Sequence, residues 1–352
     1  MVFMSVATHA SAAEFLYLAS GNTISVKVID QTTGTLRDHQ TLALDGTGPI
    51  TISPEQSFLY IVEQQLRSKR QPFIATYAIG NDGKLTLQQQ SPINMQTEYV
   101  DADATGQYLT GSHYGKGKMS VWRLTEGVYE GETVQEFTLE QKAHSTVFSQ
   151  DNRYILVPAT GPNKVFQMTF DETTGRVALN TPAFASGPTS GARQPRHLMF
   201  NRQLPIVYTT QERIHPGVAT WEWNPEKGTL TLIENIVTTH DDVKSITTAD
   251  LHITPDNTFL YISNRDDKKK RDSIIGFRID SENGRLSLIK HFPSEHIPRS
   301  FCISKSGTYL YVAGKGDAKL GAYEIHADTG ELEKITQYQT GANPIWVTTL
   351  VK

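Results

Sequence analysis

The sequence predicts an all-β fold, a seven-bladed β-propeller with four antiparallel strands in each blade. Three observations lead to this prediction. A two-strand unit recurs along the chain, a glycine-containing hairpin follows almost every unit, and the two ends of the chain carry complementary halves of the unit. Such a period is the signature of a repeat architecture, in which each unit buries its apolar faces against its neighbours.

The recurring unit is clearest at residues 249–265, ADLHITPDNTFLYISNR. Leu251 and Ile253 alternate with polar residues in a first strand, residues 254–257 have turn chemistry, and a second strand begins at Phe259. The unit recurs at residues 49–64, 99–114, 144–160, 196–212 and 299–315. The seven second strands begin 43 to 53 residues apart, at Phe15, Phe58, Tyr108, Tyr154, Ile206, Phe259 and Tyr309.

A third strand, a hairpin and a fourth strand follow each unit. Six hairpins place a glycine where a tight turn needs a positive φ, at Gly34, Gly83, Gly175, Gly228, Gly284 and Gly330. The third repeat departs, with a different loop around Gly127 and Gly131. Four-stranded units of this kind stack radially as propeller blades.

Closure of the ring follows from the two ends of the chain. The chain opens with a second strand at residues 15–21 and closes with a first strand at residues 344–350. We therefore expect residues 345–350 to complete the blade begun by residues 15–44, which leaves no open sheet edge. Residues 15–352 are then a single domain, although a chain of 352 residues would suggest two or three domains by length alone.

Residues 1–14 are excluded from the predicted fold. MVFMSVATHASAA runs from apolar to small residues and ends in an Ala-x-Ala pattern, but it lacks a basic first segment. We interpret it as a signal-peptide remnant or a disordered tail. The protein is expected to be periplasmic if residues 1–13 are a signal remnant, and cytoplasmic otherwise.

Composition and motifs exclude several classes of function. The net charge of −4 gives no reason to expect a nucleic-acid or anionic membrane partner, and no run of about 18 apolar residues exists. The single cysteine, Cys302, is expected to be a buried, inert thiol. Nucleotide-loop, zinc-protease and nucleophile-elbow motifs are absent, so no cofactor or metal is expected. A closed propeller needs no partner for stability, so a monomer is expected.

Candidate functional residues follow from the geometry of a blade. The first strand lines the central channel, and the start of the first strand meets the end of the second at the same mouth of the channel. The seven first-strand starts are Gly48, Glu98, His144, Arg196, Ala249, Arg299 and Ile345. Together with the following residues and the second-strand ends, they predict a cluster at one mouth of His144, Arg196, His197, Glu212, Asp250, Arg265, Arg299 and Lys315.

Four cations with two acids and two histidines suit an anionic substrate. Arginine forks match the geometry of carboxylate or phosphate, and a glutamate or histidine among cations can act as a base. The alternative is that these are ordinary charged strand ends at a surface. His252 lies mid-strand, so we interpret it as a structural histidine, in contrast to Asp250 at the mouth.

The segments LHITPDNTFLYISNRD, QPRHLMF, KAHSTVFSQDNRYILVPA, IPRSF and GANPIWV resemble the lactonase-type seven-bladed propellers. This family includes the propeller-type bacterial 6-phosphogluconolactonase and fungal carboxymuconate cyclase. The resemblance implies catalytic roles for His144, Arg196, Glu212 and Arg265, and Arg299 matches a recurrent arginine of the family. Departures at residues 187–194, at residues 214–217 and in the lysine-rich loop after Arg265 bear on the substrate.

The resemblance implies hydrolysis of 6-phosphoglucono-lactone to 6-phosphogluconate. Glu212 or His144 would deprotonate a water, and Arg196 would stabilise the oxyanion. Arg265, Arg299 or Lys315 would hold the phosphate, and His197 and Asp250 would contact the substrate. Two alternatives stay open: a carboxymuconate-type cyclase or lactonase acting on an unphosphorylated acid, and a non-enzymatic binding module. A cleaved signal would disfavour the phosphorylated substrate.

Overall fold

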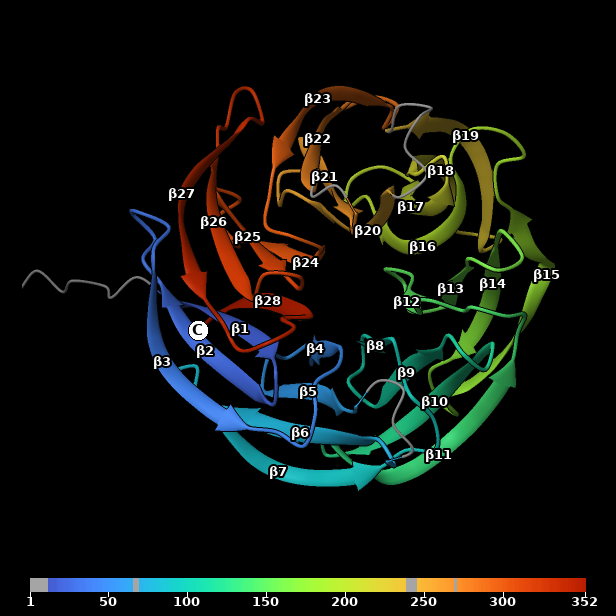
Figure 1. Cartoon of the computed structure of the whole chain (residues 1–352). Helices are drawn as coiled ribbons and strands as arrows, with labels where there is room; N and C mark the ends of the chain where they lie inside the picture. The colour runs from blue at the N-terminus through green and yellow to red at the C-terminus, as the bar shows by residue number, and fades with distance from the viewer. Residues whose placement is uncertain (1–11, 66–69, 239–245, 269–270) are drawn as a thin grey trace, which may run out of the picture.

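The computed structural model describes residues 12–65, 70–238, 246–268 and 271–352, and these form seven four-stranded antiparallel sheets around a central axis (Figure 1). The described residues contain strands and turns, with no helix that is long and apolar enough to span a membrane. The predicted all-β, seven-bladed fold is confirmed. Most of the predicted leader or tail, residues 1–11, lies outside the described residues.

The first four blades consist of the following strands, from the innermost outward. Blade 1 contains β28 (Trp346–Val351), β1 (Glu14–Ser20), β2 (Thr23–Ile29) and β3 (Leu36–Ala43). Blade 2 contains β4 (Ile50–Ile52), β5 (Phe58–Glu63), β6 (Phe73–Ile79) and β7 (Leu85–Pro92). Blade 3 contains β8 (Tyr99–Ala102), β9 (Tyr108–His113), β10 (Lys118–Thr125) and β11 (Val128–Thr138). Blade 4 contains β12 (Val147–Phe148), β13 (Tyr154–Ala159), β14 (Lys164–Asp171) and β15 (Arg176–Ser186).

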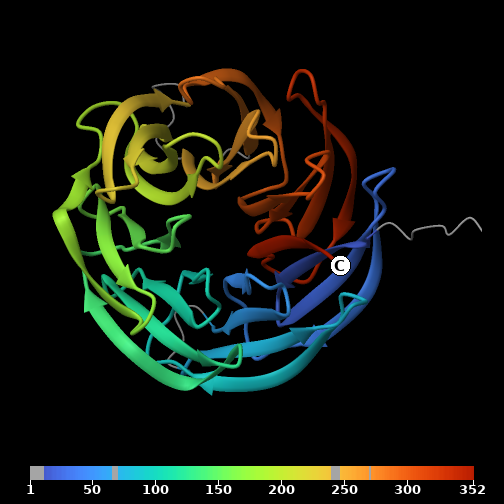
Figure 2. The same ribbon diagram turned by 180° about the vertical axis from the view of Figure 1, so that it is seen from behind.

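The last three blades follow the same order. Blade 5 contains β16 (Arg193–Phe200), β17 (Ile206–Ile214), β18 (Gly217–Asn224) and β19 (Thr229–Val237). Blade 6 contains β20 (Ile246–Ile253), β21 (Phe259–Asp266), β22 (Ser273–Ile279) and β23 (Leu286–Pro293). Blade 7 contains β24 (Pro298–Ile303), β25 (Tyr309–Gly314), β26 (Lys319–Ile325) and β27 (Leu332–Gln339). The view from behind shows the same ring of sheets (Figure 2).

The ring closes as expected from the two half units. β28 pairs with β1 in antiparallel register, with Leu350 opposite Phe15 and Trp346 opposite Ala19. The fold begins one residue earlier than predicted, because Glu14 is the first residue of β1 and is only 2% exposed. Its carboxylate accepts a hydrogen bond from the backbone N–H of Lys305 in blade 7, at 2.7 Å. The boundary set at residue 15 therefore omitted a residue that joins two blades.

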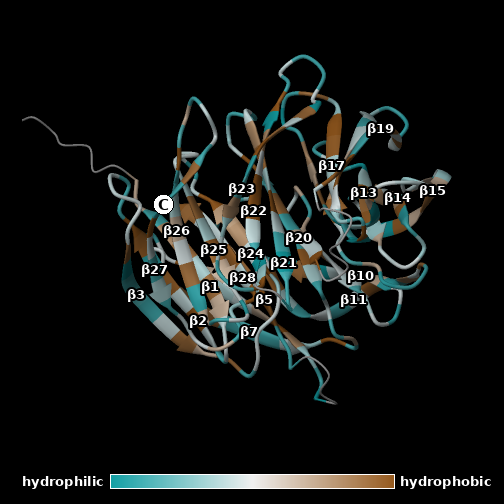
Figure 3. Ribbon diagram, turned by 45° about the horizontal axis from the view of Figure 1, so that its top comes forward, coloured by the Kyte–Doolittle hydropathy of each residue, from teal (hydrophilic) through white to brown (hydrophobic). Residues whose placement is uncertain are grey.

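The core consists of apolar residues of the inner three strands of each blade, packed against neighbouring blades. In Figure 3 the hydrophobic residues lie along the strands, and the loops are mostly hydrophilic. The second strands are largely buried; all six residues of β25, for example, are buried. Cys302 is buried at 4% exposure, in agreement with the expectation of an inert thiol.

One contact recurs at all seven interfaces between blades. A tyrosine on the second strand of one blade donates its hydroxyl to the outer hairpin of the next blade. At five interfaces the acceptor is the carbonyl of the turn glycine, in the pairs Tyr17–Gly83, Tyr60–Gly127, Tyr208–Gly284, Tyr261–Gly330 and Tyr311–Gly34. At the other two, Tyr108 donates to Thr173 and Tyr154 donates to Glu226. The contact includes Gly127, in the loop that departs from the hairpin pattern.

The turn glycine is also required by the residue that begins the second strand. Gly330 has φ +72°, and a Cβ built on it would lie 2.5 Å from the ring of Phe259 in blade 6. A side chain would therefore be strained by its backbone and would clash with the neighbouring blade. The sequence shows the turn glycines and the second-strand starts as two separate patterns. The packing of the second-strand start of one blade against the turn glycine of the next explains why both recur.

We predict that Tyr261→Phe lowers the free energy of unfolding by about 1–3 kcal/mol, because it leaves the buried carbonyl of Gly330 without its donor. Tyr154→Phe is the matched control, since its bond to Glu226 is exposed and water can replace it; we expect a loss below about 0.5 kcal/mol. Urea denaturation measures both. A loss below about 0.5 kcal/mol in Tyr261→Phe would show that this hydroxyl contact does not hold the blades together.

Candidate functional site

The innermost strands of blades 4 to 7 are irregular at the first-strand starts predicted from the sequence. In blade 5, Pro195 pairs with Gln211 but Leu198 pairs with Thr209, so β16 contains one extra residue. The same happens between residues 248 and 251 of β20 and between residues 298 and 300 of β24. In blade 4, Ala143 pairs with Ala159 and Val147 pairs with Leu156, so the innermost segment again contains one extra residue. β-Bulges of this kind re-aim side chains and are frequent beside active sites.

Hydroxyl groups on the second strands satisfy the backbone groups that the bulges leave unpaired. The N–H of His197 donates to Oγ1 of Thr210 at 3.2 Å, and that hydroxyl donates to the carbonyl of Ala249 at 3.1 Å. The N–H of Asp250 donates to Oγ of Ser263 at 2.9 Å. Thr210 and Ser263 are fully buried, so these bonds fix the bulges in place.

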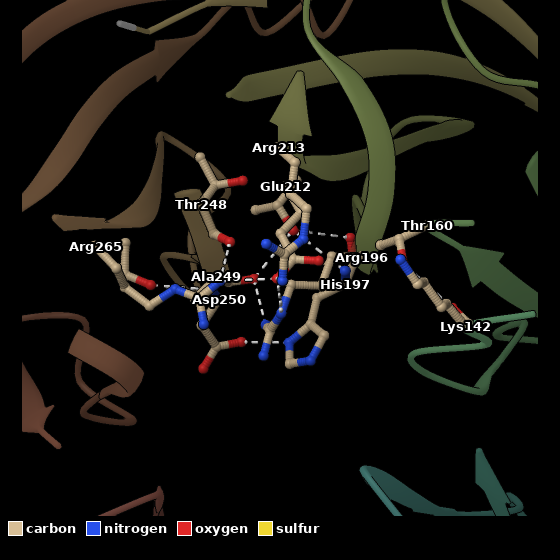
Figure 4. A network of polar contacts seen from close by, with 12 residues as sticks. Lys142, Thr160, Arg196, His197, Glu212, Arg213, Thr248, Ala249, Asp250 and Arg265 are labelled. Carbon is tan, nitrogen blue, oxygen red and sulfur yellow. Dashed lines mark hydrogen bonds and ion pairs between the residues drawn. The ribbon is translucent and has the colours of Figure 1, made fainter. Parts of the chain in front are cut away.

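Arg196, Glu212 and Arg265 converge from blades 5 and 6 (Figure 4). Oε1 of Glu212 accepts from Nη2 of Arg265 at 3.0 Å and lies 3.9 Å from Nε of Arg196. Each guanidinium also donates to a backbone carbonyl of β20: Arg196 to Ala249 at 2.6 Å, and Arg265 to Thr248 at 3.0 Å. All three residues are at most 8% exposed. Oε2 of Glu212 and Nε of both arginines have no hydrogen-bond partner among the described residues.

Positive charge exceeds negative charge in this cluster. Burial, followed by the charges of Arg265 and Arg299, lowers the pKa of Arg196 well below its ordinary value. The pKa of Arg299 is lowered by burial and by Arg265. Guanidinium groups stay protonated in proteins despite such shifts. Burial raises the pKa of Glu212, but Arg196 and Arg265 outweigh it, so the carboxylate is ionised. Three arginines outnumber the two ionised carboxylates, Glu212 and Asp250, and leave a positive potential suited to an anion.

Two neutral histidines lie beside the arginines. The rings of His144 and His197 are 5.3 Å apart in an edge-to-face arrangement. Burial and Arg196 lower the pKa of His144 well below 6.5, and the same two causes lower the pKa of His197 to about 4. Nδ1 of His144 and Nε2 of His197 have no hydrogen-bond partner among the described residues. Each ring thus presents an uncommitted nitrogen.

Asp250 contacts two histidines in the channel. Its Oδ1 is 2.9 Å from Nδ1 of His197, and its Oδ2 is 3.5 Å from Nε2 of His252. Both residues line a cavity of about 160 Å³ in the channel, together with Tyr99, His197 and Trp346. His252, interpreted from the sequence as a structural histidine, thus has a carboxylate partner in Asp250. Residues two apart on a strand share a face, so the two side chains meet.

Lys315 is not among the residues that line the cavity beside His197 and Asp250. It lines another cavity of about 270 Å³, together with Gly21, Gln64 and Asn343 among other residues of blades 1, 2 and 7. The structure thus gathers His144, Arg196, His197, Glu212, Arg265 and Arg299, with Asp250 in contact with His197. None of the described residues form a group of three or more potential metal ligands.

Glu98 is a site residue that the sequence reasoning counted as a strand start but left out of the cluster. Its Oε2 accepts from the N–H of Tyr114 at 2.8 Å. Burial raises the pKa of Glu98 to about 7, and the bond to Tyr114 and the charge of Arg299 oppose that rise. Glu98 starts the first strand of its blade, as His144, Arg196 and Arg299 do in theirs. This equivalent position could have identified Glu98 as a site residue from the sequence.

The comparisons with known proteins agree with this architecture. The family model described as "Lactonase, 7-bladed beta-propeller" matches residues 5–349. The chain belongs to the seven-bladed propeller lactonase family. The membership expected from the sequence motifs is thereby confirmed.

Relatives extend over most of the chain. A protein of Cronobacter sakazakii named 6-phosphogluconolactonase is 30% identical over 85% of this chain and 86% of its own length. A protein of the same name from Photorhabdus laumondii is 29% identical over 96% of this chain and 99% of its own length. The solved structure of a periplasmic gluconolactonase from Pseudomonas aeruginosa covers 96% of this chain and 99% of that one, with a TM-score of 0.87 and 21% identity. That likeness concerns the fold.

We predict that Thr210→Val lowers the free energy of unfolding by about 1–3 kcal/mol, because the N–H of His197 and the carbonyl of Ala249 both lose a buried partner. Thr169→Val is the control, since this half-buried threonine on β14 makes only a long bond to Ala178. We expect it to change stability by less than about 0.5 kcal/mol. Chemical denaturation measures both, and a harmless Thr210→Val would mean that the bulge does not depend on this hydroxyl.

We predict that Glu98 contributes a part of the stability that falls as pH rises from 4.5 towards 7, while the lowered pKa values of His144 and His197 contribute a part that rises over the same range. The raised pKa of Glu98 means that the folded state holds the proton more tightly than the unfolded chain, so this stability is lost as pH rises through about 7. Glu98→Gln removes this falling part, so the change of stability with pH should be more positive in the variant than in the wild type. Asp101, whose pKa is also raised to about 7 by burial, should contribute equally in both proteins.

Glu136→Gln is the control for this measurement. A hydrogen bond from Asn94 lowers the pKa of Glu136, so its contribution is present above pH 4.5 and is lost only at lower pH. Urea midpoints measured across the pH series should therefore show the wild-type slope in this variant. Identical slopes in wild type and Glu98→Gln would contradict the assignment of the proton to Glu98.

Proposed function

We propose that this protein hydrolyses a sugar lactone that carries an anionic group, with 6-phosphoglucono-lactone as the first candidate. The observation that supports this most is the buried excess of arginine charge at one mouth of the channel, where Arg196, Arg265 and Arg299 outnumber the ionised carboxylates of Glu212 and Asp250. Relatives named 6-phosphogluconolactonase, aligned over most of the chain, support the same reaction.

The arginines would bind the substrate and stabilise charge that develops in the reaction. Arg265 and Arg299 are the groups for the phosphate, because guanidinium forks bind phosphate oxygens in bidentate fashion. Arg196 is nearly inaccessible and is held by Ala249, so it is fixed before substrate arrives. A fixed cation in a water-poor site stabilises an oxyanion strongly, because it needs no reorganisation during the reaction.

Water activation falls to an imidazole in this proposal. Glu212, one of the two bases expected from the sequence, shares its Oε1 with Arg265 and has a lowered pKa, so it is a weak proton acceptor and acts as a clamp for the arginines. His144, the other, is neutral and has an unpaired nitrogen, as does the adjacent His197. A neutral imidazole can accept the proton of the attacking water.

We predict that Arg265→Gln raises KM for 6-phosphoglucono-lactone by roughly 10- to 100-fold, the equivalent of one charged hydrogen bond, with a smaller effect on unphosphorylated glucono-lactone. Arg213→Gln is the matched control: Arg213 contacts the same oxygen of Glu212 at 3.4 Å, but its side chain is 51% exposed. Its KM should stay within about threefold of wild type. Lactone disappearance in a pH-stat assay gives both constants.

Three results would redirect the proposal. Equal effects of Arg265→Gln on both lactones would remove the phosphate role of Arg265. Faster turnover of a carboxymuconate-type lactone than of either sugar lactone would favour the dicarboxylate alternative, in which the arginines bind carboxylates. Absence of turnover, with no shift of melting temperature by any lactone, would contradict a lactonase and favour a binding module.

A further inference from the structure

The two histidines at the channel mouth differ in what holds them. Nδ1 of His197 lies 2.9 Å from Oδ1 of Asp250, and both side chains are less than a tenth exposed. Nδ1 of His144 has no hydrogen-bond partner among the described residues. The two residues of the His197–Asp250 pair come from the bulges of β16 and β20, which are 53 residues apart in the chain.

Asp250 is itself held firmly as an anion. Besides His197, its oxygens accept from the backbone N–H groups of Leu251 at 3.1 Å and Phe301 at 3.3 Å. Burial raises the pKa of Asp250, but His252 and His197 outweigh burial, and the pKa is below its ordinary value. A carboxylate anchored in this way can only accept a hydrogen bond, so it selects the His197 tautomer with the proton on Nδ1.

The consequence for His197 is a free acceptor nitrogen. With its proton on Nδ1, Nε2 carries the lone pair, and this atom is buried without a partner among the described residues. The ring is fixed on its other sides by Tyr99, at 5.2 Å between centroids, and by His144, at 5.3 Å. An oriented imidazole with a buried carboxylate on one nitrogen and a free lone pair on the other is the arrangement of a general base.

We propose that His197 is the general base of the lactonase reaction and that Asp250 is its positioning residue. This inference rests on the proposed function and deepens it. Nε2 of His197 removes a proton from water while the water oxygen forms a bond to the lactone carbonyl carbon. The tetrahedral oxyanion then reforms the carbonyl as the ring C–O bond breaks, and the ring oxygen takes the proton from Nε2. The products are a hydroxy acid and neutral His197.

The charges that face His197 explain why it is the stronger base of the pair. Burial, Arg196 and Arg299 lower its pKa, while Asp250 raises it. His144 experiences the same arginines and also His197, without a carboxylate that opposes them. An anionic substrate bound to the arginines would offset their charge and raise the proton affinity of His197 at the moment of reaction.

The experiment compares kcat and KM of four variants with 6-phosphoglucono-lactone and with glucono-lactone. We expect His197→Gln and Asp250→Asn to lower kcat by roughly 10²–10⁴-fold with little change in KM, because they affect proton transfer and not substrate binding. His144→Gln should lower kcat by less than His197→Gln. His252→Gln is the control for damage to Asp250: it removes the other histidine that contacts this carboxylate, and kcat should stay within about threefold of wild type.

A pH profile separates a positioning role of Asp250 from a structural one. In the wild type, kcat/KM should be level at neutral pH and fall at acidic pH, where His197 becomes protonated. Loss of the carboxylate in Asp250→Asn removes a group that raises the pKa of His197, so the acidic limb should move to lower pH. A merely structural defect would lower activity without moving the limb.

Rescue by added imidazole distinguishes a missing base from poor folding, because only a folded variant that lacks the base can recover activity. His197→Ala leaves space beside the cavity of about 160 Å³, so added imidazole should restore part of the lost kcat if the missing group is a base. The same addition should have no effect on Arg196→Ala, whose missing group is a cation.

The outcomes distinguish this inference from the function on which it rests. An active wild type with His197→Gln within about threefold of it, or with a larger loss in His144→Gln, overturns the assignment of the base and leaves the lactonase intact. An unmoved acidic limb in Asp250→Asn overturns the positioning role. A wild type that hydrolyses no lactone overturns the proposed function, and the inference fails with it.

Discussion

The contact on which the rest of this structure depends is the one between a second-strand tyrosine and the outer hairpin of the next blade. It occurs at all seven interfaces, and at five of them the acceptor is the turn glycine itself. A hydrogen bond has a narrow range of distance and angle, so seven of them set how far each blade turns relative to the last. The channel and its mouths are a result of that angle.

Within that frame, bulges in the innermost strands supply the functional groups. A regular strand alternates its side chains, so neighbouring residues point to opposite faces. The extra residue in β16 breaks this alternation at Arg196 and His197, and both side chains then contact blade 6. Thr210 and Ser263 stabilise the irregular backbone, because their hydroxyl oxygens accept hydrogen bonds from its otherwise unpaired N–H groups. Burying three arginines is unfavourable without an anion, and a substrate anion relieves this unfavourable free energy.

Particular residues show where sequence reasoning succeeded and where it failed. His144, Arg196, Glu212 and Arg265 could be identified because strand starts and ends can be counted from the turns, and the structure places them together. Lys315 has an equivalent position in its repeat, yet its side chain lines a different cavity, together with residues of blades 1 and 2. Glu98 was missed because nothing local in the sequence shows that its carboxyl is desolvated. The contact between Asp250 and His252 was not foreseen, although a period of two places the two residues on one face.

The sequence alone determined the number of blades, the closure of the ring and the mouth at which charged residues gather, because these follow from a repeat and from the alternation of turns and strands. Only the tertiary structure decided which charges pair. The bond between His197 and Asp250, and the sharing of Glu212 between Arg196 and Arg265, join residues 53 apart or on different strands. The distances between these side chains depend on the angle between blades and on one extra residue in a strand. Neither can be predicted from the local sequence pattern.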